Sequence, residues 1–303
     1  NFNEINVLSS ILKPDQVVIT NINPTHLANF KNTRNIAIEK SDLFNPKYNP
    51  NINTVILPIS NKDEEFMFRM AKKYKIKKII TFGHSKKANF YIKKFRVLNN
   101  FQAEIYLYVG KKIIKFKVPS SFQQHSLNII ISYIIFILNK IKTNNFFKII
   151  KKFPIVHGRG KKHKIQIGNK KINLIDESYN ASPTSMNNSI NYFENLICEK
   201  NQKKFLVLGE MNELGKKDLF FHKNLVFKLL KTNIYKVIFC GNIYKDILDK
   251  ITFNKEKFYN ASNEKRIMSL LIKEIHNNDI ILVKSSNNTK VNLFVQHLLN
   301  KDI

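Results

Sequence analysis

Polar side chains follow the ends of several short apolar runs, and their types are those that bind ligands and catalyse reactions. In an open parallel sheet, ligands bind beyond the carboxyl ends of the strands. The strand-like runs, rich in β-branched residues, are residues 16–20, 54–57, 171–175, 204–208 and 279–283. The polar residues that follow them are Asn21, Thr25, His26, Ser60, Asn61, Asp63, Asp176, Glu177, Tyr179, Asn180, Glu210, Asn212, Glu213, Lys284, Ser285 and Ser286. Each one alone could instead start a turn or cap a helix, but their recurrence after successive strands favours a binding site.

Three residues could contact an anion or a metal ion directly. His26 could bind a metal or a phosphate, or be an ordinary loop histidine. Lys40 lies on a predicted helix at residues 35–44 and is one lysine among many. Arg159 lies between two glycines, which let the backbone approach an anion closely. The sequence contains no GxxxxGK(S/T) phosphate loop, and its Cys and His residues show no metal-ligand spacing.

The first half of the chain has the pattern of a sheet with helical crossovers. Its further predicted strands are residues 78–82, 90–97, 102–109 and 112–118. Its further predicted helices are residues 5–12, 62–74, 127–142 and 145–151. A helix between the strands at 54–57 and 78–82 predicts parallel pairing, and the turn at Gly110 predicts a hairpin.

The second half restarts the pattern at Pro154. A hairpin is predicted at residues 164–168 and 171–175, and a further strand at residues 236–240. The predicted helices are residues 185–198, 219–230, 243–248, 265–275 and 291–299. This alternation predicts an α/β fold with two Rossmann-like domains and mostly parallel sheets, at residues 1–153 and 154–303.

The chain is strongly basic. Its 303 residues carry a formal net charge of +29, from 51 Lys+Arg against 22 Asp+Glu. Such a charge could bind nucleic acid. However, the lysines are dispersed, and Lys, Asn, Ile and Phe are abundant while Trp is absent, a bias that AT-rich codons produce. We therefore interpret the charge as solvated surface and expect no nucleic-acid partner.

Membrane insertion and a disulfide framework are both disfavoured. No run reaches the roughly 20 apolar residues of a membrane span, and the nearest, residues 127–138, contains Asn128 and Ser132. Cys198 and Cys240 are too few for a disulfide framework and suit a reducing compartment. We expect a cytoplasmic protein without a membrane span.

Two strings in the second half resemble the C-terminal domain of the Mur ligases. Residues 174–186 read LIDESYNASPTSM, and residues 207–215 read VLGEMNELG, with His222 downstream. Within the family they are most similar to the MurF type, whose pattern is LID(D/E)SYNANP.SM followed by VLG(D/E)M.ELG. Other Mur ligases carry different residues at the first string, so this match discriminates within the family.

Further strings match the family in the same order along nearly the whole chain. ITNINPTHLANF at residues 19–30 is similar to ITNIGPAHLE.F, and IAIEKSDLF at residues 36–44 is similar to IA.AKGEIF. Residues 58–66 resemble the element LNRDD.YF. PIVHGR at residues 154–159 resembles P.KGR, and ILVKSS at residues 281–286 resembles VLVKGS.

The resemblance implies an ATP-dependent ligase of peptidoglycan precursor synthesis, which we expect to be a monomer. The carboxylate of UDP-MurNAc-tripeptide would attack the γ-phosphate of ATP and give an acyl phosphate. The amine of D-Ala-D-Ala would then attack the acyl phosphate through a tetrahedral intermediate. Because anionic reactants must meet, Mg²⁺ and cationic side chains would have to neutralise their charge.

The resemblance also implies roles for individual residues. Lys40 would be carbamylated, and it would hold Mg²⁺ together with His26. The residues implied on the ATP side are Asn21, Asn61, Asp63, His125, Asn128, Arg159, Asp176 and Glu177. The residues implied on the side of the peptide substrates are Tyr179, Asn180, Ser185 and Lys284.

The sequence also departs from the family pattern. Residues 120–130 read SSFQQHSLNII where the family has PG.HN..NA, and Ser285 replaces a glycine. The match begins after the family's UDP-sugar-binding domain and GT.GKT phosphate loop. We therefore expect a first domain that is incomplete at its N-terminus and a chain that alone binds ATP weakly and forms no product. The open alternatives are another amide ligase of the superfamily, a basic nucleic-acid-binding protein and an inactive remnant.

Overall fold

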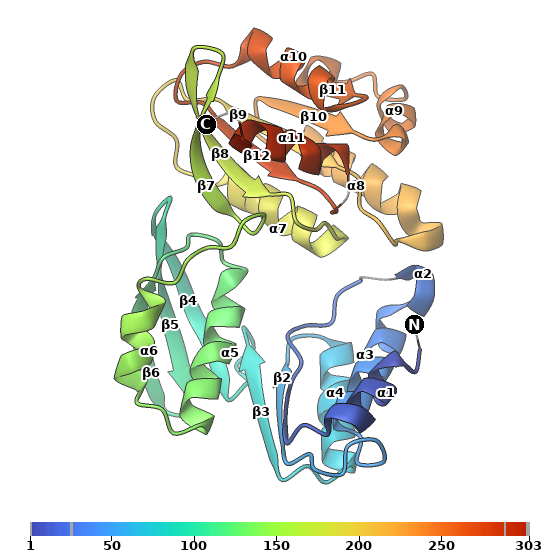
Figure 1. Ribbon diagram of the computed structural model, residues 1–303, viewed down its shortest axis with the longest axis vertical. Helices are drawn as coiled ribbons and strands as arrows, with labels where there is room; N and C mark the ends of the chain where they lie inside the picture. The colour runs from blue at the N-terminus through green and yellow to red at the C-terminus, as the bar shows by residue number, and fades with distance from the viewer. Residues whose placement is uncertain (1, 25–26, 288, 301–303) are drawn as a thin grey trace. The chain divides into compact units, whose positions relative to one another are not determined.

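A computed structural model describes residues 2–24, 27–287 and 289–300 (Figure 1). It divides into two compact units, residues 1–153 and 154–303, each built around a six-stranded sheet. Both sheets are mostly parallel and carry helices, so the expected α/β fold class is confirmed.

The sheet of the first unit follows the order of the chain. Its strands are β1 (Gln16–Val18), β2 (Thr54–Pro58), β3 (Lys78–Gly83), β4 (Phe90–Asn99), β5 (Gln102–Val109) and β6 (Lys112–Val118). Neighbouring strands from β1 to β4 pair in parallel, while β4, β5 and β6 pair antiparallel. The hairpin expected at Gly110 is therefore confirmed, and this glycine has a φ of +61°.

Helices cover both faces of this sheet (Figure 1). They are α1 (Glu4–Leu12), α2 (Leu27–Phe30), α3 (Thr33–Ser41), the 3₁₀ turn η1 (Asp42–Phe44), α4 (Lys62–Lys73), α5 (His125–Leu138) and α6 (Thr143–Ile150). Ile56 and Ile80 pack with Ile130 of α5 and Phe146 of α6 in one core cluster. α4 packs against β2 and β3 from the other face (Figure 1). All five residues of β2 are buried, as expected for a strand covered on both faces.

The second unit has the crossed strand order β11-β10-β9-β12-β8-β7. These strands are β7 (Lys161–Ile167), β8 (Lys170–Glu177), β9 (Lys204–Gly209), β10 (Lys236–Cys240), β11 (Phe258–Ala261) and β12 (Ile280–Lys284). All neighbours are parallel except β7 and β8, which form a hairpin. Because β12 pairs with both β8 and β9, the polar residues that follow these three central strands leave the sheet at the same edge.

Five helices and two 3₁₀ turns complete the described part of the second unit. They are α7 (Pro183–Glu194), η2 (Gly215–Lys217), α8 (Asp218–Leu230), α9 (Asn242–Leu248), η3 (Lys255–Lys257), α10 (Glu264–Glu274) and α11 (Lys290–Asn300). α10 and α11 pack on one face, where Leu271 and Phe294 join a core cluster with Ile281 and Val283. α7 packs against α8, and α8 packs against α9.

The structure differs from the expected elements at several boundaries. The helix expected at residues 35–44 becomes α3, and its last residues tighten into η1. The helix expected at residues 185–198 ends at Glu194. The strand β11 was not expected, because its sequence FYNA is short and half polar, and pairing with β10 forms it. Among the described residues, no helix is long and apolar enough to cross a membrane.

Candidate functional site

Lys40 lies in the last turn of α3, where its side chain crosses to the segment that follows β1. Its Nζ donates a hydrogen bond to the backbone oxygen of Asn21 at 3.0 Å. Burial lowers the pKa of the Lys40 ammonium below its usual value. In a larger fraction of molecules, the Lys40 side chain is therefore the neutral amine, which is the form that reacts with carbon dioxide. His26, the other expected metal ligand, lies outside the described residues.

Asn61 and Asp63 begin the helix that packs against α3. The side chain of Asn61 caps α4 by accepting hydrogen bonds from the backbone N–H groups of Asp63 and Glu64, both at 3.0 Å. Asp63 accepts a hydrogen bond from Thr33 Oγ1 at 2.5 Å and lies 3.1 Å from Arg34 Nε. These contacts tie α4 to the start of α3 and so help to position the helix that carries Lys40.

His125 and Asn128 lie in the first turn of α5. The His125 ring stacks on Phe122 at 5.3 Å between centroids, and its Nδ1 lies 2.8 Å from Ser120 Oγ. Asn128, three residues after His125, is exposed. The structure thus places this pair on a helix that covers the opposite face of the sheet from α4 (Figure 1).

In the second unit, a glycine-rich loop packs against the end of β8. Gly158 has a φ of +69°, and its backbone N–H donates to Asp176 Oδ2 at 2.8 Å. A Cβ atom on Gly158 would lie 2.7 Å from Tyr179 Cβ, so the close approach requires glycine. The loop places the guanidinium of Arg159 4.2 Å from the centre of the Tyr179 ring. This stacking holds a cation beside the end of β8.

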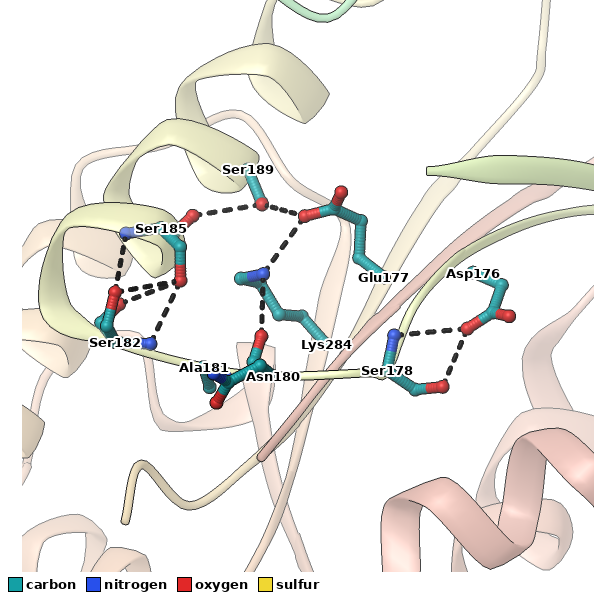
Figure 2. Close-up of polar contacts among 9 residues, drawn as sticks. All are labelled: Asp176, Glu177, Ser178, Asn180, Ala181, Ser182, Ser185, Ser189 and Lys284. Atoms are coloured by element: carbon teal, nitrogen blue, oxygen red, sulfur yellow. Dashed lines mark hydrogen bonds and ion pairs between the residues drawn. The ribbon is translucent and has the colours of Figure 1, made fainter. Parts of the chain in front are cut away.

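Asp176 is buried at the end of β8, with 3% of its surface exposed. Besides the Gly158 contact, it accepts hydrogen bonds from the backbone N–H and the hydroxyl of Ser178, at 3.0 and 2.7 Å (Figure 2). Three donors thus fix the orientation of this carboxylate. Its cross-strand partner on β7 is Lys161.

Glu177 and Lys284 form a buried ion pair between the neighbouring strands β8 and β12 (Figure 2). Lys284 Nζ lies 3.0 Å from Glu177 Oε2, and each side chain is 4% exposed. Ser189 of α7 donates to the same carboxylate at 2.6 Å, and Lys284 also donates to the backbone oxygen of Asn180 at 3.2 Å. The pair therefore links both strands, α7 and the loop after β8.

Asn180 and Ser185 lie in the segment that leads into α7. Asn180 is exposed, and its side-chain oxygen accepts from the N–H of Ala181 at 2.7 Å. Ser185 and Ser182 form a reciprocal capping box at the start of α7 (Figure 2). Pro183 lies in the first turn of the same helix. The Ser185 hydroxyl is therefore engaged in the cap.

The loop after β9 is held by a buried histidine. His222 on α8 accepts a hydrogen bond at Nε2 from the backbone N–H of Met211 at 3.0 Å. This contact assigns the ring proton to Nδ1, which lies 2.9 Å from the backbone oxygen of Asp218. The histidine downstream of VLGEMNELG thus supports the conformation of that string.

Comparisons with known proteins agree with this architecture. The profile of the Mur ligase middle domain matches residues 1–135, and that of the Mur ligase glutamate ligase domain matches residues 164–287. The chain belongs to the Mur ligase family. The expected family is thereby confirmed, and each matched domain falls in one of the two compact units.

The most similar Mur ligases include UDP-N-acetylmuramoyl-tripeptide–D-alanyl-D-alanine ligases of two bacteria. The enzyme of Rickettsia prowazekii is 29% identical over 297 residues, which cover 97% of this chain and 63% of the relative. The enzyme of Buchnera aphidicola (subspecies Baizongia pistaciae) is 26% identical over 98% of this chain and 62% of the relative. The chain therefore spans a little under two thirds of the length of these relatives.

Solved structures of Mur ligases share the fold. MurF from Acinetobacter baumannii matches with a TM-score of 0.80 at 19% identity, over 99% of this chain and 63% of that chain. The MurF ligase of Thermotoga maritima in complex with ADP matches with a TM-score of 0.80 at 19% identity, over 100% and 66%.

The second Mur ligase unit also brings together residues that the sequence pattern did not connect. His157, His163 and Asp176 each offer a ligand atom, and these atoms lie within 4.8 Å of one another. The sequence showed no metal-ligand spacing. His157 lies on a loop and His163 on the strand β7, so no single periodic element connects them. The alternation of the hairpin was the available signal, since Lys161 and His163 share the face on which Asp176 lies.

Proposed function

We propose that this chain forms part of the ATPase domain and the C-terminal domain of a MurF-type ligase, which joins D-Ala-D-Ala to UDP-MurNAc-tripeptide at the expense of ATP. The observation that carries the proposal is the match to ligases of that name over 97 and 98% of the chain. The reaction would activate the tripeptide carboxylate as an acyl phosphate before the dipeptide amine attacks. Because the match covers 63% of the Rickettsia relative, the proposal concerns the activity of the full-length ligase.

The family resemblance assigns residues of each unit to the side of ATP. In the second unit, Arg159 supplies a fixed positive charge for phosphate oxygens, and Asp176 holds the backbone of the loop that carries it. In the first unit, the assignments of Asn61, Asp63, His125 and Asn128 to the adenosine side follow from the family resemblance. The capping contacts of Asn61 and Asp63 support a positioning role for these two residues.

Lys40 fits the role of a carbamylated metal ligand. Burial lowers the pKa of Lys40 and so raises the fraction of neutral amine at a given pH, and the contact with Asn21 holds Nζ beside the segment after β1. Carbamylation would turn this cation into an anionic oxygen donor, the ligand type that Mg²⁺ prefers. When bound, Mg²⁺ would neutralise phosphate charge, while Lys40 would fix its position. His26 would be the second protein ligand.

The end of β8 would face the peptide substrates. Tyr179 and Asn180 are exposed there, whereas the Lys284 ammonium is buried beneath them and bonded to the Asn180 backbone. Lys284 would therefore act by positioning the loop. Ser185 would contribute through the cap of α7.

The deciding experiment measures dipeptide-dependent ligation. This chain, joined to the UDP-sugar and phosphate-loop segment of the Rickettsia relative, is supplied with ATP, Mg²⁺ and UDP-MurNAc-tripeptide. We expect amide formation and ADP release with D-Ala-D-Ala, and neither with D-glutamate or meso-diaminopimelate. Preferential use of another amine would assign the chain to a different amide ligase, and no turnover with any amine would support an inactive remnant.

The same assay tests Lys40. We expect Lys40→Ala to abolish turnover and added bicarbonate or a short carboxylate to restore part of it. The matched control is Lys72→Ala, since Lys72 is exposed on α4 and lies over the Phe68 ring. Equal effects of the two substitutions would contradict a metal-holding role for Lys40.

A further inference from the structure

We propose that His157, His163 and Asp176 form a site for a divalent cation of the zinc type in the second unit. Each residue offers one ligand atom, and the three atoms lie within 4.8 Å of one another. Two imidazoles and one carboxylate make a donor set typical of transition-metal sites in proteins. All three residues belong to the second unit, whereas Lys40, for which we propose a Mg²⁺ role, belongs to the first.

The hairpin of β7 and β8 builds two sides of the site. Asp176 on β8 pairs with Lys161 on β7 in antiparallel register. His163 lies two residues beyond Lys161, so its side chain leaves the same face of the sheet. The rigid ladder of the hairpin thus fixes the spacing of His163 and Asp176.

The glycine loop supplies the third ligand. His157 directly precedes Gly158, whose N–H is bonded to Asp176 at 2.8 Å, so this loop is anchored on the carboxylate itself. Gly160 N–H also donates to the backbone oxygen of Asp176 at 2.7 Å. The His157 and His163 rings lie 5.6 Å apart between centroids and are inclined by 31°. The hydrogen bonds of Gly158 and Gly160 to Asp176 therefore hold the loop that carries His157 beside the hairpin.

To bind a metal ion, the three ligand atoms must move closer together than the 4.8 Å within which they now lie. Ligand atoms around a tetrahedral zinc ion are about 3.3 Å apart. His157 is exposed, so rotation of its side chain can bring its nitrogen inward without disturbing the core. Asp176 is held by Gly158 and Ser178, as carboxylate ligands usually are by neighbouring donors. Three protein ligands leave the fourth position for water.

Charge sets the strength and the class of the site. Lys161 Nζ lies 2.8 Å from His157 Nε2, so a cation already contacts one ligand and opposes metal binding. Imidazole nitrogens favour Zn²⁺, Ni²⁺ and Co²⁺, whereas Mg²⁺ prefers oxygen ligands. We therefore expect moderate affinity for Zn²⁺, no competition from Mg²⁺, and tighter binding when Lys161 is removed. Bound metal would also fix the loop that carries Arg159.

The test is a titration of the purified chain, without a histidine tag, with Zn²⁺ followed by calorimetry and with Co²⁺ followed by visible absorption. We expect one equivalent to bind and to raise the melting temperature. His157→Ala and His163→Ala should each weaken binding at least tenfold, whereas Lys161→Ala should strengthen it. Melting of the metal-free variants shows whether each remains folded, and His157 is exposed, so its removal should leave the fold intact.

The matched control is His276→Ala. His276 is also exposed and lies 4.0 Å from a buried aspartate, Asp279, but no described second histidine joins that pair. We expect this variant to bind Zn²⁺ like the parent chain. The proposal is overturned if His157→Ala and His163→Ala retain the parent affinity. It is also overturned if His276→Ala loses as much affinity as they do, or if excess Mg²⁺ displaces Zn²⁺.

Discussion

Glu177 and Lys284 are two charged side chains that the fold removes from water. The sequence places both directly at strand ends, where Glu177 was expected on the ATP side or as a helix cap and Lys284 on the side of the peptide substrates. The structure shows instead an ion pair in which both side chains are 4% exposed, with Ser189 completing the contacts of the carboxylate. Each charge compensates the desolvation of the other, because a buried charge without a partner strongly destabilises the fold.

This pair predicts a specific pattern of stability losses. Glu177→Gln or Lys284→Met alone leaves one buried charge unpaired and should lower the free energy of unfolding by about 3–5 kcal/mol. The double variant should lose less than the sum, which a double-mutant cycle from urea unfolding measures. Glu65→Gln is the control, because it breaks the exposed Lys87–Glu65 pair and should change stability little. Additive losses would show that the two side chains do not interact.

Lys162 predicts a pH dependence of stability. Burial lowers its pKa from the usual 10.5 to about 8, so the folded state releases this proton before the unfolded state does. Below pH 8, Lys162 is charged in both states, and burying the charge lowers the free energy of unfolding by its full amount. The free energy of unfolding should then rise with pH between about 8 and 10.5. Lys162→Met should therefore raise the free energy of unfolding at pH 7, by at most about 3 kcal/mol.

The measurement compares Lys162→Met with the parent chain in urea at several pH values. We expect the advantage of the variant to shrink as the pH rises from 8 toward 10.5, because the parent then carries a neutral amine in the folded state. Lys161→Met is the neighbouring control. A constant difference between pH 7 and 10 would show that burial does not shift the Lys162 pKa.

At the scale of elements, the start of α7 joins a structural signal to the expected site. Ser182 accepts from the N–H of Ser185 while the Ser185 hydroxyl accepts from the N–H of Ser182, and Pro183 fits the first turn. The helix therefore begins where the site loop ends. The position of Asn180 follows from this cap and from its bond to Lys284.

The cap predicts a local stability effect. Ser182→Ala should lower the free energy of unfolding by about 1 kcal/mol, because one N–H group of the first turn loses its partner. Ser269→Ala is the control, since Ser269 lies on α10 and its hydroxyl bonds back to Arg266 in the same helix. Thermal and urea unfolding compare the two variants. Equal stability of Ser182→Ala and the parent chain would contradict the capping role.

At the scale of the whole molecule, each unit has its own sheet and its own buried core. The described core cluster of the second unit includes Leu174, Val207, Ile281 and Phe294, and all its residues lie between 165 and 299. A domain with an independent core can fold alone.

We therefore expect residues 154–303, expressed alone, to unfold cooperatively and to keep native-like circular dichroism in the far and near ultraviolet. The full chain should then show a transition at the same urea concentration. A non-cooperative transition, with near-ultraviolet signal lost, would show that the second unit depends on the first.

Sequence reasoning located most strands and helices because buried parallel strands read as continuous apolar runs. The run KVIFC forms β10 with the predicted bounds, and the hairpin predicted from the turn at Gly110 is confirmed. Helix ends were less predictable. Apolar residues continue at helical spacing as far as Cys198, so the sequence predicts a helix to residue 198, but the helix ends at Glu194. β11 was missed since its four residues gain their order from pairing with β10.

The sequence by itself determined the α/β class, the family and the residues at the strand ends, because periodicity and contiguous motifs are local properties of a chain. Only the tertiary structure decided what those residues touch. It paired Glu177 with Lys284 across neighbouring strands, stacked Arg159 on Tyr179 and gathered His157, His163 and Asp176. These contacts depend on strand register and on the path of a glycine loop. Both are set by the packing of the whole unit, since the spacing of residues along the chain does not specify which strands become neighbours.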